Sequence, residues 1–184
     1  EKLILSWDQL TTEEQTAHFS QKGQAVAVQR SRQKRVTEYF RLVFRGMLSA
    51  SMERTLIGTL IPPGSSHIHG AQSNAFRDIA VLLGAGALSS SAVADFFLKS
   101  TGRSNLHGTW TTLPWLTPSA SLNARYLVLN SLTIHYAPLW EEVFTPDFNS
   151  QRWSQPSSPR LPQDFFTRLT PKWQRNCALR TDYA

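Results

Sequence analysis

An apolar run that ends in two prolines, "RTLIGTLIPPGSSHIHG" at residues 54–70, constrains the fold more than any other segment. Its first half has strand-like residues, and proline cannot donate the backbone hydrogen bond that further pairing would need. We therefore expect a strand over "RTLIGTLIPP" that stops at Pro62. Apolar residues fall on both of its faces, which predicts a buried strand in the centre of a sheet. The loop that follows carries His67 and His69, whose role has to be inferred from the rest of the chain.

A second strand is predicted within "EYFRLVFRGML", where apolar and basic residues alternate. Alternation places every second side chain on the same face of a strand. The two faces are Phe40, Leu42 and Phe44 on one side, and Arg41, Val43 and Arg45 on the other. We expect the first face to point into the core and the two arginines to project into solvent. The intervening "SASME" is long enough for a hairpin turn between the two strands.

Two helices are predicted in "FRDIAVLLGAGALSSSAVADFFLKSTG", joined at the serines. Asp78 can cap the first helix, a serine among residues 89–91 can cap the second, and Gly102 suits the position just after its end. The expected buried face of the second helix is Val93, Phe96 and Phe97. The Gly-x-Gly in "LLGAGAL" lacks the third glycine of a nucleotide-binding turn, so helix packing is the better interpretation.

A longer helical pattern, "SLNARYLVLNSLTIHYAPLWEEVF", follows a short extended piece closed by prolines. Ser119 or Ser121 can cap it, and Pro138 predicts a kink. The residues expected to face the core are Leu122, Tyr126, Leu129, Tyr136, Leu139 and Val143. Further on, Pro171 suits the first position of a last helix.

Size, charge and cysteine content narrow the class of protein. The chain has 184 residues, 41% of them hydrophobic, which is enough to bury the core of one domain. The formal net charge of +6 favours a polyanionic partner. Cys177 is the only cysteine, which excludes an internal disulfide or a cysteine-based zinc site within one copy and favours a cytoplasmic protein. No apolar run approaches the ~20 residues that span a bilayer.

The candidate functional side chains are basic or polar and lie on the predicted strands and loops. Short hydroxyl, amide and imidazole groups beside glycines are typical of loops that contact nucleic acid. The candidates for DNA contact are Arg41, Arg45, Arg54, His67, His69, Lys99, Arg103, Ser104, Asn105 and His107. A metal site at His67 and His69 would need a third and fourth ligand, and no cysteine is near. A metal-dependent nuclease that uses these histidines, and a basic protein-interaction domain, remain as alternatives.

The order of these segments resembles a known family. The strand "RTLIGTLIPPG", the helical pair "LSSSAVADFF" and the closing "LPWL" are similar to the target-recognition region of type IIG-like restriction-modification enzymes, which are adenine-specific DNA methyltransferases. Type I restriction specificity subunits share this pattern, and the resemblance covers most of residues 36–144. The family's Asn-Pro-Pro-Tyr-type tetrapeptide, which holds the flipped adenine, is absent, because "IPPG" has neither the amide nor the aromatic residue.

The resemblance implies an α+β fold, a small twisted and mostly antiparallel sheet flanked by helices. It implies a specificity domain that recognises double-stranded DNA without modifying it and that works with the rest of a larger parent chain. S-adenosylmethionine, and magnesium if DNA is also cut, would be cofactors of that parent, with none in this segment. The implied division is a basic helical or linker segment at 1–35, a target-recognition core at 36–144, and a proline-rich loop with a truncated C-terminal helix at 145–184.

Overall fold

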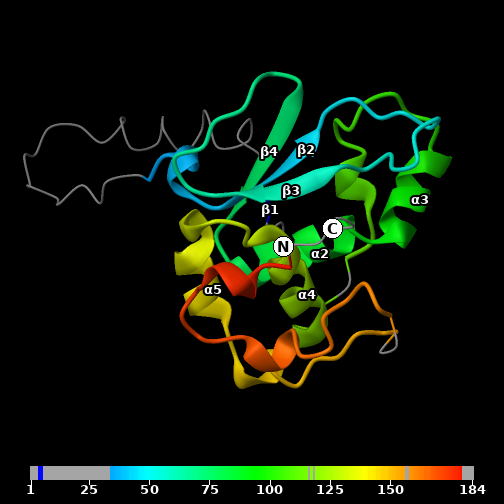
Figure 1. Cartoon of the computed structure of the whole chain (residues 1–184). Coiled ribbons are helices and arrows are strands. Elements are labelled where there is room, and N and C mark those ends of the chain that lie inside the picture. The colour runs from blue at the N-terminus through cyan, green and yellow to red at the C-terminus, as the bar shows by residue number, and fades with distance from the viewer. Residues whose placement is uncertain (1–3, 6–33, 116, 118, 156–157, 180–184) are drawn as a thin grey trace, which may run out of the picture.

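A three-stranded antiparallel sheet packed against four helices forms the α+β fold of this chain, as the sequence predicted. The computed structural model describes residues 4–5, 34–115, 117, 119–155 and 158–179. In Figure 1 helices α2, α4 and α5 lie below the sheet, and α3 lies beside its right-hand end. The basic helical or linker segment expected at residues 1–35 lies mostly outside the described residues.

Strand β2 (Arg41–Arg45) is the centre of the sheet and pairs antiparallel with both of its neighbours. Strand β3 (Gly58–Ile61) lies on one side and β4 (Ala71–Phe76) on the other. The two-residue strand β1 (Ile4–Leu5) adds to the outer edge of β4. The predicted hairpin between β2 and β3 is confirmed. Strands β4 and β1 were not predicted, because "AQSNAF" and "IL" carry no clear strand pattern.

The prediction that "RTLIGTLIPP" is a central strand is wrong, because β3 lies at the edge of the sheet. Side chains from the helical layer cover that edge. Asn130 Oδ1 accepts a hydrogen bond from Leu60 N at 3.2 Å, and the Tyr136 hydroxyl donates to Leu60 O at 2.8 Å. Burial raises the pKa of Tyr136, so its hydroxyl keeps the proton that it donates. An edge strand covered in this way can be apolar on both faces without exposing its backbone to another chain.

Residues 62–70 cross from one side of the sheet to the other. Both β3 and β4 run antiparallel to β2, so they run in the same direction, and their connection has to return across the sheet. Leu42 and Phe44 are 1% exposed on the face that packs against the helices. The crossing segment covers the opposite face, where Arg41 donates a hydrogen bond to Ser65 O. We call residues 62–70 the crossover loop.

Helices α2 (Ile79–Ser89) and α3 (Ala92–Ser100) begin and end at the predicted caps. Asp78 Oδ1 accepts from Ala80 N at 2.7 Å, and Ser91 Oγ accepts from Ala94 N at 3.1 Å. Gly102, with φ of +65°, follows the C-cap of α3.

The predicted buried face of α3 is wrong. Val93, Phe96 and Phe97 are exposed, and the residues that face the protein are Ala94, Asp95 and Leu98. The cause is Asp95, whose carboxylate faces inward to accept backbone hydrogen bonds from the segment that leads into β3.

The long helical pattern after residue 119 is two helices instead of one kinked helix. Helix α4 (Ala120–Asn130) has Ser119 as its N-cap, and α5 (Ala137–Val143) has Pro138 in its first turn, where proline is tolerated. A 3-10 turn at Ile134–Tyr136 joins them. Of the expected core residues, Tyr126 and Leu139 are buried and Tyr136 and Val143 partly buried, whereas Leu122 and Leu129 are exposed.

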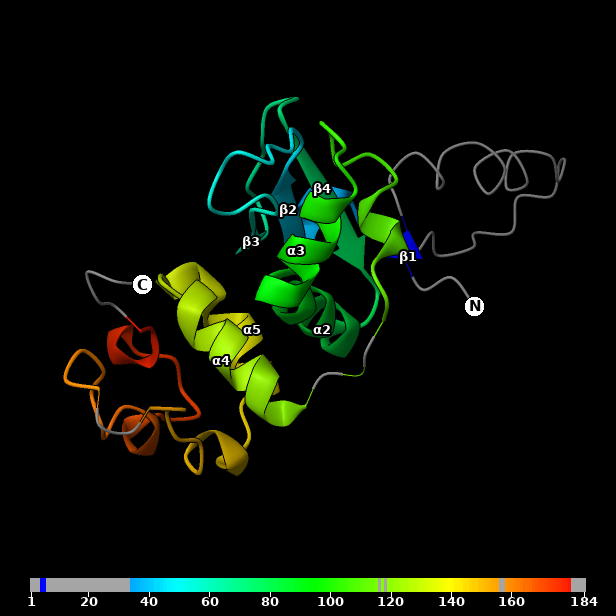
Figure 2. The ribbon, with the colours of Figure 1, turned by 90° about the vertical axis from the view of Figure 1, so that its right-hand side faces the viewer.

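The described residues 145–155 and 158–179 pack along α4 and α5 (Figure 2). The Trp140 indole N–H donates to Thr170 O at 2.9 Å, and the Trp173 indole N–H donates to Ser131 O at 3.0 Å. Residues 171–179 contain one 3-10 turn, Arg175–Cys177, so the helix expected to begin at Pro171 is absent from the described part of this segment.

Helices α2 and α4 approach closely at Gly86. A Cβ atom at this position would overlap the ring of Tyr126, which is 4% exposed and has little space to move. The second glycine of the Gly-x-Gly pair, Gly86, therefore serves helix packing, in agreement with the prediction from the sequence. Any residue larger than glycine has to push the two helices apart.

We expect Gly86→Ala to lower the free energy of unfolding, because overpacking costs about 1–3 kcal/mol. The higher helix propensity of alanine offsets about 1 kcal/mol of this cost. Chemical denaturation measures the change. Gly70→Ala is the control, because a Cβ there meets nothing within 4 Å. Equal stability of the two variants would contradict the close approach at Gly86.

Candidate nucleic-acid interface

Three loops meet at the end of strand β2, and Gly46 is the residue that joins them. Gly46 N donates to Gly70 O at 2.9 Å, at the end of the crossover loop. Gly46 O accepts from Leu106 N at 2.8 Å, and Leu48 N donates to Ser104 O at 2.9 Å. The crossover loop and the segment 103–107, which we call the recognition loop, are thus both bonded to the chain that continues β2.

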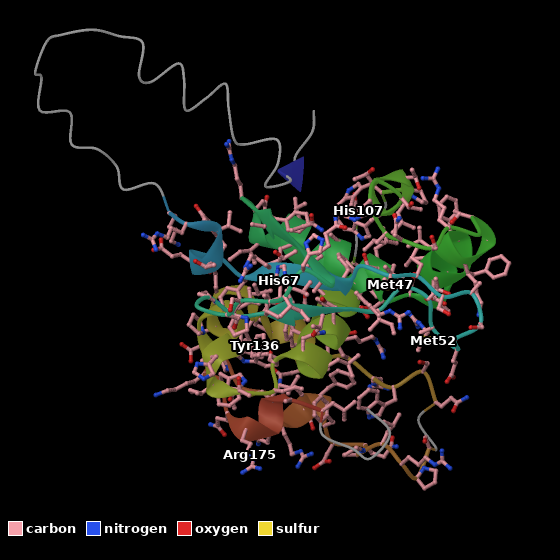
Figure 3. All side chains as sticks on the ribbon, turned by 90° about the horizontal axis from the view of Figure 1, so that it is seen from above. Met47, Met52, His67, His107, Tyr136 and Arg175 are labelled. Atoms are coloured by element: carbon pink, nitrogen blue, oxygen red, sulfur yellow. The ribbon has the colours of Figure 1, made fainter. Side chains whose placement is uncertain are left out.

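The side chains that the sequence predicted on these two loops are exposed. They are His67 and His69 on the crossover loop, and Arg103, Ser104, Asn105 and His107 on the recognition loop. Figure 3, which looks down on the sheet, shows His67, Met47 and His107 on this side of the molecule. The structure therefore brings together two groups of candidates that lie far apart in the sequence.

The recognition loop is bounded by two glycines in the left-handed region, Gly102 with φ of +65° and Gly108 with φ of +63°. Residues with a Cβ are strained in this region, so the two positions favour glycine. Between them, the backbone bridge from Asn105 to Met47 fixes the loop against the end of β2. The loop has a defined shape while its polar side chains remain accessible.

His67 is held above the sheet by two hydrogen bonds. Its Nδ1 lies 3.0 Å from Ile68 O and its Nε2 lies 2.8 Å from Ser73 Oγ on β4. A carbonyl oxygen only accepts, so Nδ1 is the donor in the bond to Ile68 O. His69 is exposed two residues further on.

Arg41 does not project into solvent, which corrects the expectation from the alternating pattern. It is 3% exposed beneath the crossover loop, where it donates hydrogen bonds to Ser65 O and, at 3.3 Å, to Ser73 Oγ. Burial lowers the pKa of Arg41, although a guanidinium still stays charged at neutral pH. Its role is to hold the crossover loop onto the sheet, and it is covered from any ligand.

The other three cationic candidates on the sheet side also contact the protein itself. Arg45 is half-buried, and its Nε donates to Met47 O at 2.8 Å. Arg54 donates to Ser90 O at 3.1 Å, and Lys99 Nζ donates to Met52 O at 2.8 Å. Each contact ties the β2–β3 connection to itself or to the helices, so these residues help to shape the surface.

Asp95 is a structural residue that sequence reasoning missed. It is 6% exposed, and its Oδ1 accepts hydrogen bonds from Thr55 N at 2.8 Å and Leu56 N at 2.6 Å. Arg54 Nε lies 3.5 Å from the same oxygen. A lone carboxylate amid the apolar residues of "SAVADFFLK" was the available signal, because such a group is buried only when it is paired.

Among the described residues, no group of three or more His, Cys, Asp or Glu side chains could hold a metal ion. The nuclease alternative at His67 and His69 therefore gains no support from this part of the chain. No single described helix is long and apolar enough to cross a membrane; α2 and α3 meet the criterion only as a pair bent by 67°.

Comparison with models of protein families found no match for this chain. Comparisons with curated proteins and with solved structures also found no match. The resemblance to target-recognition regions is therefore an inference from the segments of this sequence alone.

We expect Arg41→Ala to lower the free energy of unfolding by about 1–3 kcal/mol, because it leaves the buried groups around Ser65 and Ser73 without their donor. The exposed Arg103→Ala should change it by about 0.5 kcal/mol or less. Denaturant titration of both variants tests the assignment. A large loss for Arg103→Ala, or none for Arg41→Ala, would reverse the two roles.

We expect Asp95→Ala to cost at least about 2 kcal/mol of stability, because the N–H groups of Thr55 and Leu56 lose a charged acceptor in a buried site. Arg54→Ala should cost about 1 kcal/mol or less, because this side chain is 41% exposed and solvent screens its ion pair. Thermal unfolding of the two variants gives the comparison. Similar losses for both would show that the ion pair, and not the backbone contacts, stabilises the segment.

Proposed function

We propose that this chain recognises duplex DNA through its crossover loop and recognition loop, as a specificity domain that does no chemistry itself. The observation that supports the proposal most is the junction at Gly46, which holds both loops at one end of the sheet. Loops supported by a rigid sheet are where binding residues concentrate in proteins.

The chemistry of the two loops suits a nucleic-acid ligand. Residues 62–70 and 103–107 contain no acidic residue, and their exposed groups are guanidinium, imidazole, hydroxyl and amide. These groups make hydrogen bonds to phosphate oxygens and to base edges in DNA grooves. The net charge of +6 adds a favourable long-range field for a polyanion.

The candidates divide into two groups with different tasks. Arg41 holds the crossover loop onto the sheet, and Arg45 and Arg54 make hydrogen bonds that fix the β2–β3 connection. Arg103, Asn105 and His107 are exposed and available to a ligand. Arginine can donate two parallel hydrogen bonds to the edge of a guanine, so Arg103 is the strongest candidate for reading sequence.

A domain of this kind has a place beside an enzyme that modifies bases. A methyltransferase has to extrude its target base, and a separate module that holds the duplex in register serves that step. The resemblance of residues 36–144 to target-recognition regions supports this assignment. The proposal gives the chain itself no cofactor.

The test begins with selection of duplexes from a randomised library by the 184-residue chain. We expect Arg103→Ala to lose about 1–3 kcal/mol, or about 5- to 150-fold, on the selected duplex and to lose discrimination against a scrambled one. His107→Ala should weaken binding in the same assay. Fluorescence anisotropy at two salt concentrations separates sequence reading from phosphate attraction.

Arg175→Ala is the matched control, because Arg175 is also an exposed arginine but lies on the opposite side of the view from His67 and His107 in Figure 3. It should keep the affinity and discrimination of the unchanged chain. Failure to enrich any duplex would overturn the function. Enrichment that Arg103→Ala and His107→Ala both leave unchanged would overturn the choice of loops.

A further inference from the structure

Helix α3 presents a stripe of apolar side chains to solvent. Val93 is 79% exposed, Phe96 is 72% exposed and Phe97 is 39% exposed. Their spacing of three and four residues places them on one face of the helix, opposite the buried Asp95 and Leu98. Leaving two phenylalanines in water is unfavourable, and contiguous exposed apolar residues often mark an interaction site. We call these three residues the α3 face.

The apolar surface continues onto the β2–β3 connection. Lys99 Nζ donates to Met52 O at 2.8 Å, which brings Met52, 43% exposed, next to α3. Near the start of α3 lies an open cavity of about 200 Å³, lined by Arg54, Leu56, Ile57, Gly58 and Ser90. The helix therefore projects beside a hollow whose lining is part apolar and part cationic.

The charges around this surface are mostly positive. Lys99 and Arg103 flank the C-terminal end of α3, and Arg54, which lines the cavity, is paired with Asp95 at 3.5 Å. The acidic residues in segments 41–61 and 90–107 are Glu53 and Asp95, and Asp95 is buried against backbone N–H groups. In these two segments, Glu53 therefore carries the exposed carboxylate that could balance the cations.

We propose that the α3 face and the adjacent cavity bind a short acidic segment of a partner protein that carries apolar anchor residues. The anchors pack against Phe96 and Phe97 and enter the cavity, while a carboxylate pairs with Lys99, whose ammonium group keeps further donors beside the one bonded to Met52 O. Aromatic side chains surrounded by groups that exclude water are typical of the strongest positions in protein interfaces. The cavity favours a peptide over a membrane surface, because a bilayer has no side chain to place in it. This inference does not rest on DNA binding.

The experiment uses a phage-displayed library of random peptides selected on the 184-residue chain. We expect the enriched peptides to combine Asp or Glu with Leu, Phe or Trp, and to bind more weakly as salt increases. Phe96→Ser should reduce their affinity by at least about tenfold, and so should Lys99→Glu. Thermal unfolding checks that both variants fold, which the exposure of Phe96 leads us to expect.

Leu129→Ser is the matched control, because Leu129 is an exposed apolar residue on another helix, at 46% exposure. It should leave peptide affinity unchanged. Enrichment of no peptides or of non-acidic peptides, or unchanged affinity for Phe96→Ser, would overturn the proposal. Two further results would also overturn it. One is that the chain sediments with phosphatidylserine vesicles and Phe96→Ser abolishes this. The other is that the chain dimerises as its concentration rises and Phe96→Ser abolishes that. Duplex binding by Phe96→Ser should persist, which separates this test from that of the DNA interface.

Discussion

The structure depends on the need to cover both faces of strand β2, which carry opposite chemistry. Leu42 and Phe44 require an apolar layer, and α2 supplies it as it packs beneath the sheet. Arg41 on the other face requires hydrogen-bond acceptors, because a buried guanidinium without them is costly. The crossover loop supplies Ser65 O, and β4 supplies Ser73 Oγ. The loop is therefore fixed over this face of the sheet, where His67 bonds to Ser73 on β4.

Periodicity and capping were sufficient to predict the parts of the fold that depend on neighbours in the chain. Alternation placed Leu42 and Phe44 on one face of β2, and the prolines ended β3 at Ile61. Side-chain oxygens of Asp78 and Ser91 begin α2 and α3 as expected. These features arise within a few residues of the chain, so the sequence alone contains their cause.

The errors concern contacts between distant segments. The periodic spacing of apolar residues shows which residues share a face of a strand or helix, but not which face packs against the rest of the protein. Arg41 was therefore expected in solvent and Phe96 in the core. The position of β3 at the sheet edge depends on Asn130 and Tyr136, more than 60 residues away. Among the candidate site residues, Arg103 and His107 were predicted to be exposed on loops, and they are. The hydrogen bonds by which Arg45 and Lys99 fix the β2–β3 connection follow only from three-dimensional contacts.

Helix α3 connects the two surfaces for which we propose partners. Asp95 and Lys99 bond it to the β2–β3 connection, and Gly102 leads from its end into the recognition loop. The bond from Leu48 N to Ser104 O then closes a short path between the connection and the loop. Coupling between two binding sites is reciprocal by thermodynamic necessity, and a shared structural element with two arrangements is one way to produce it. A partner on the α3 face that shifted this path would therefore change duplex affinity by the same factor as the duplex changes affinity for the partner.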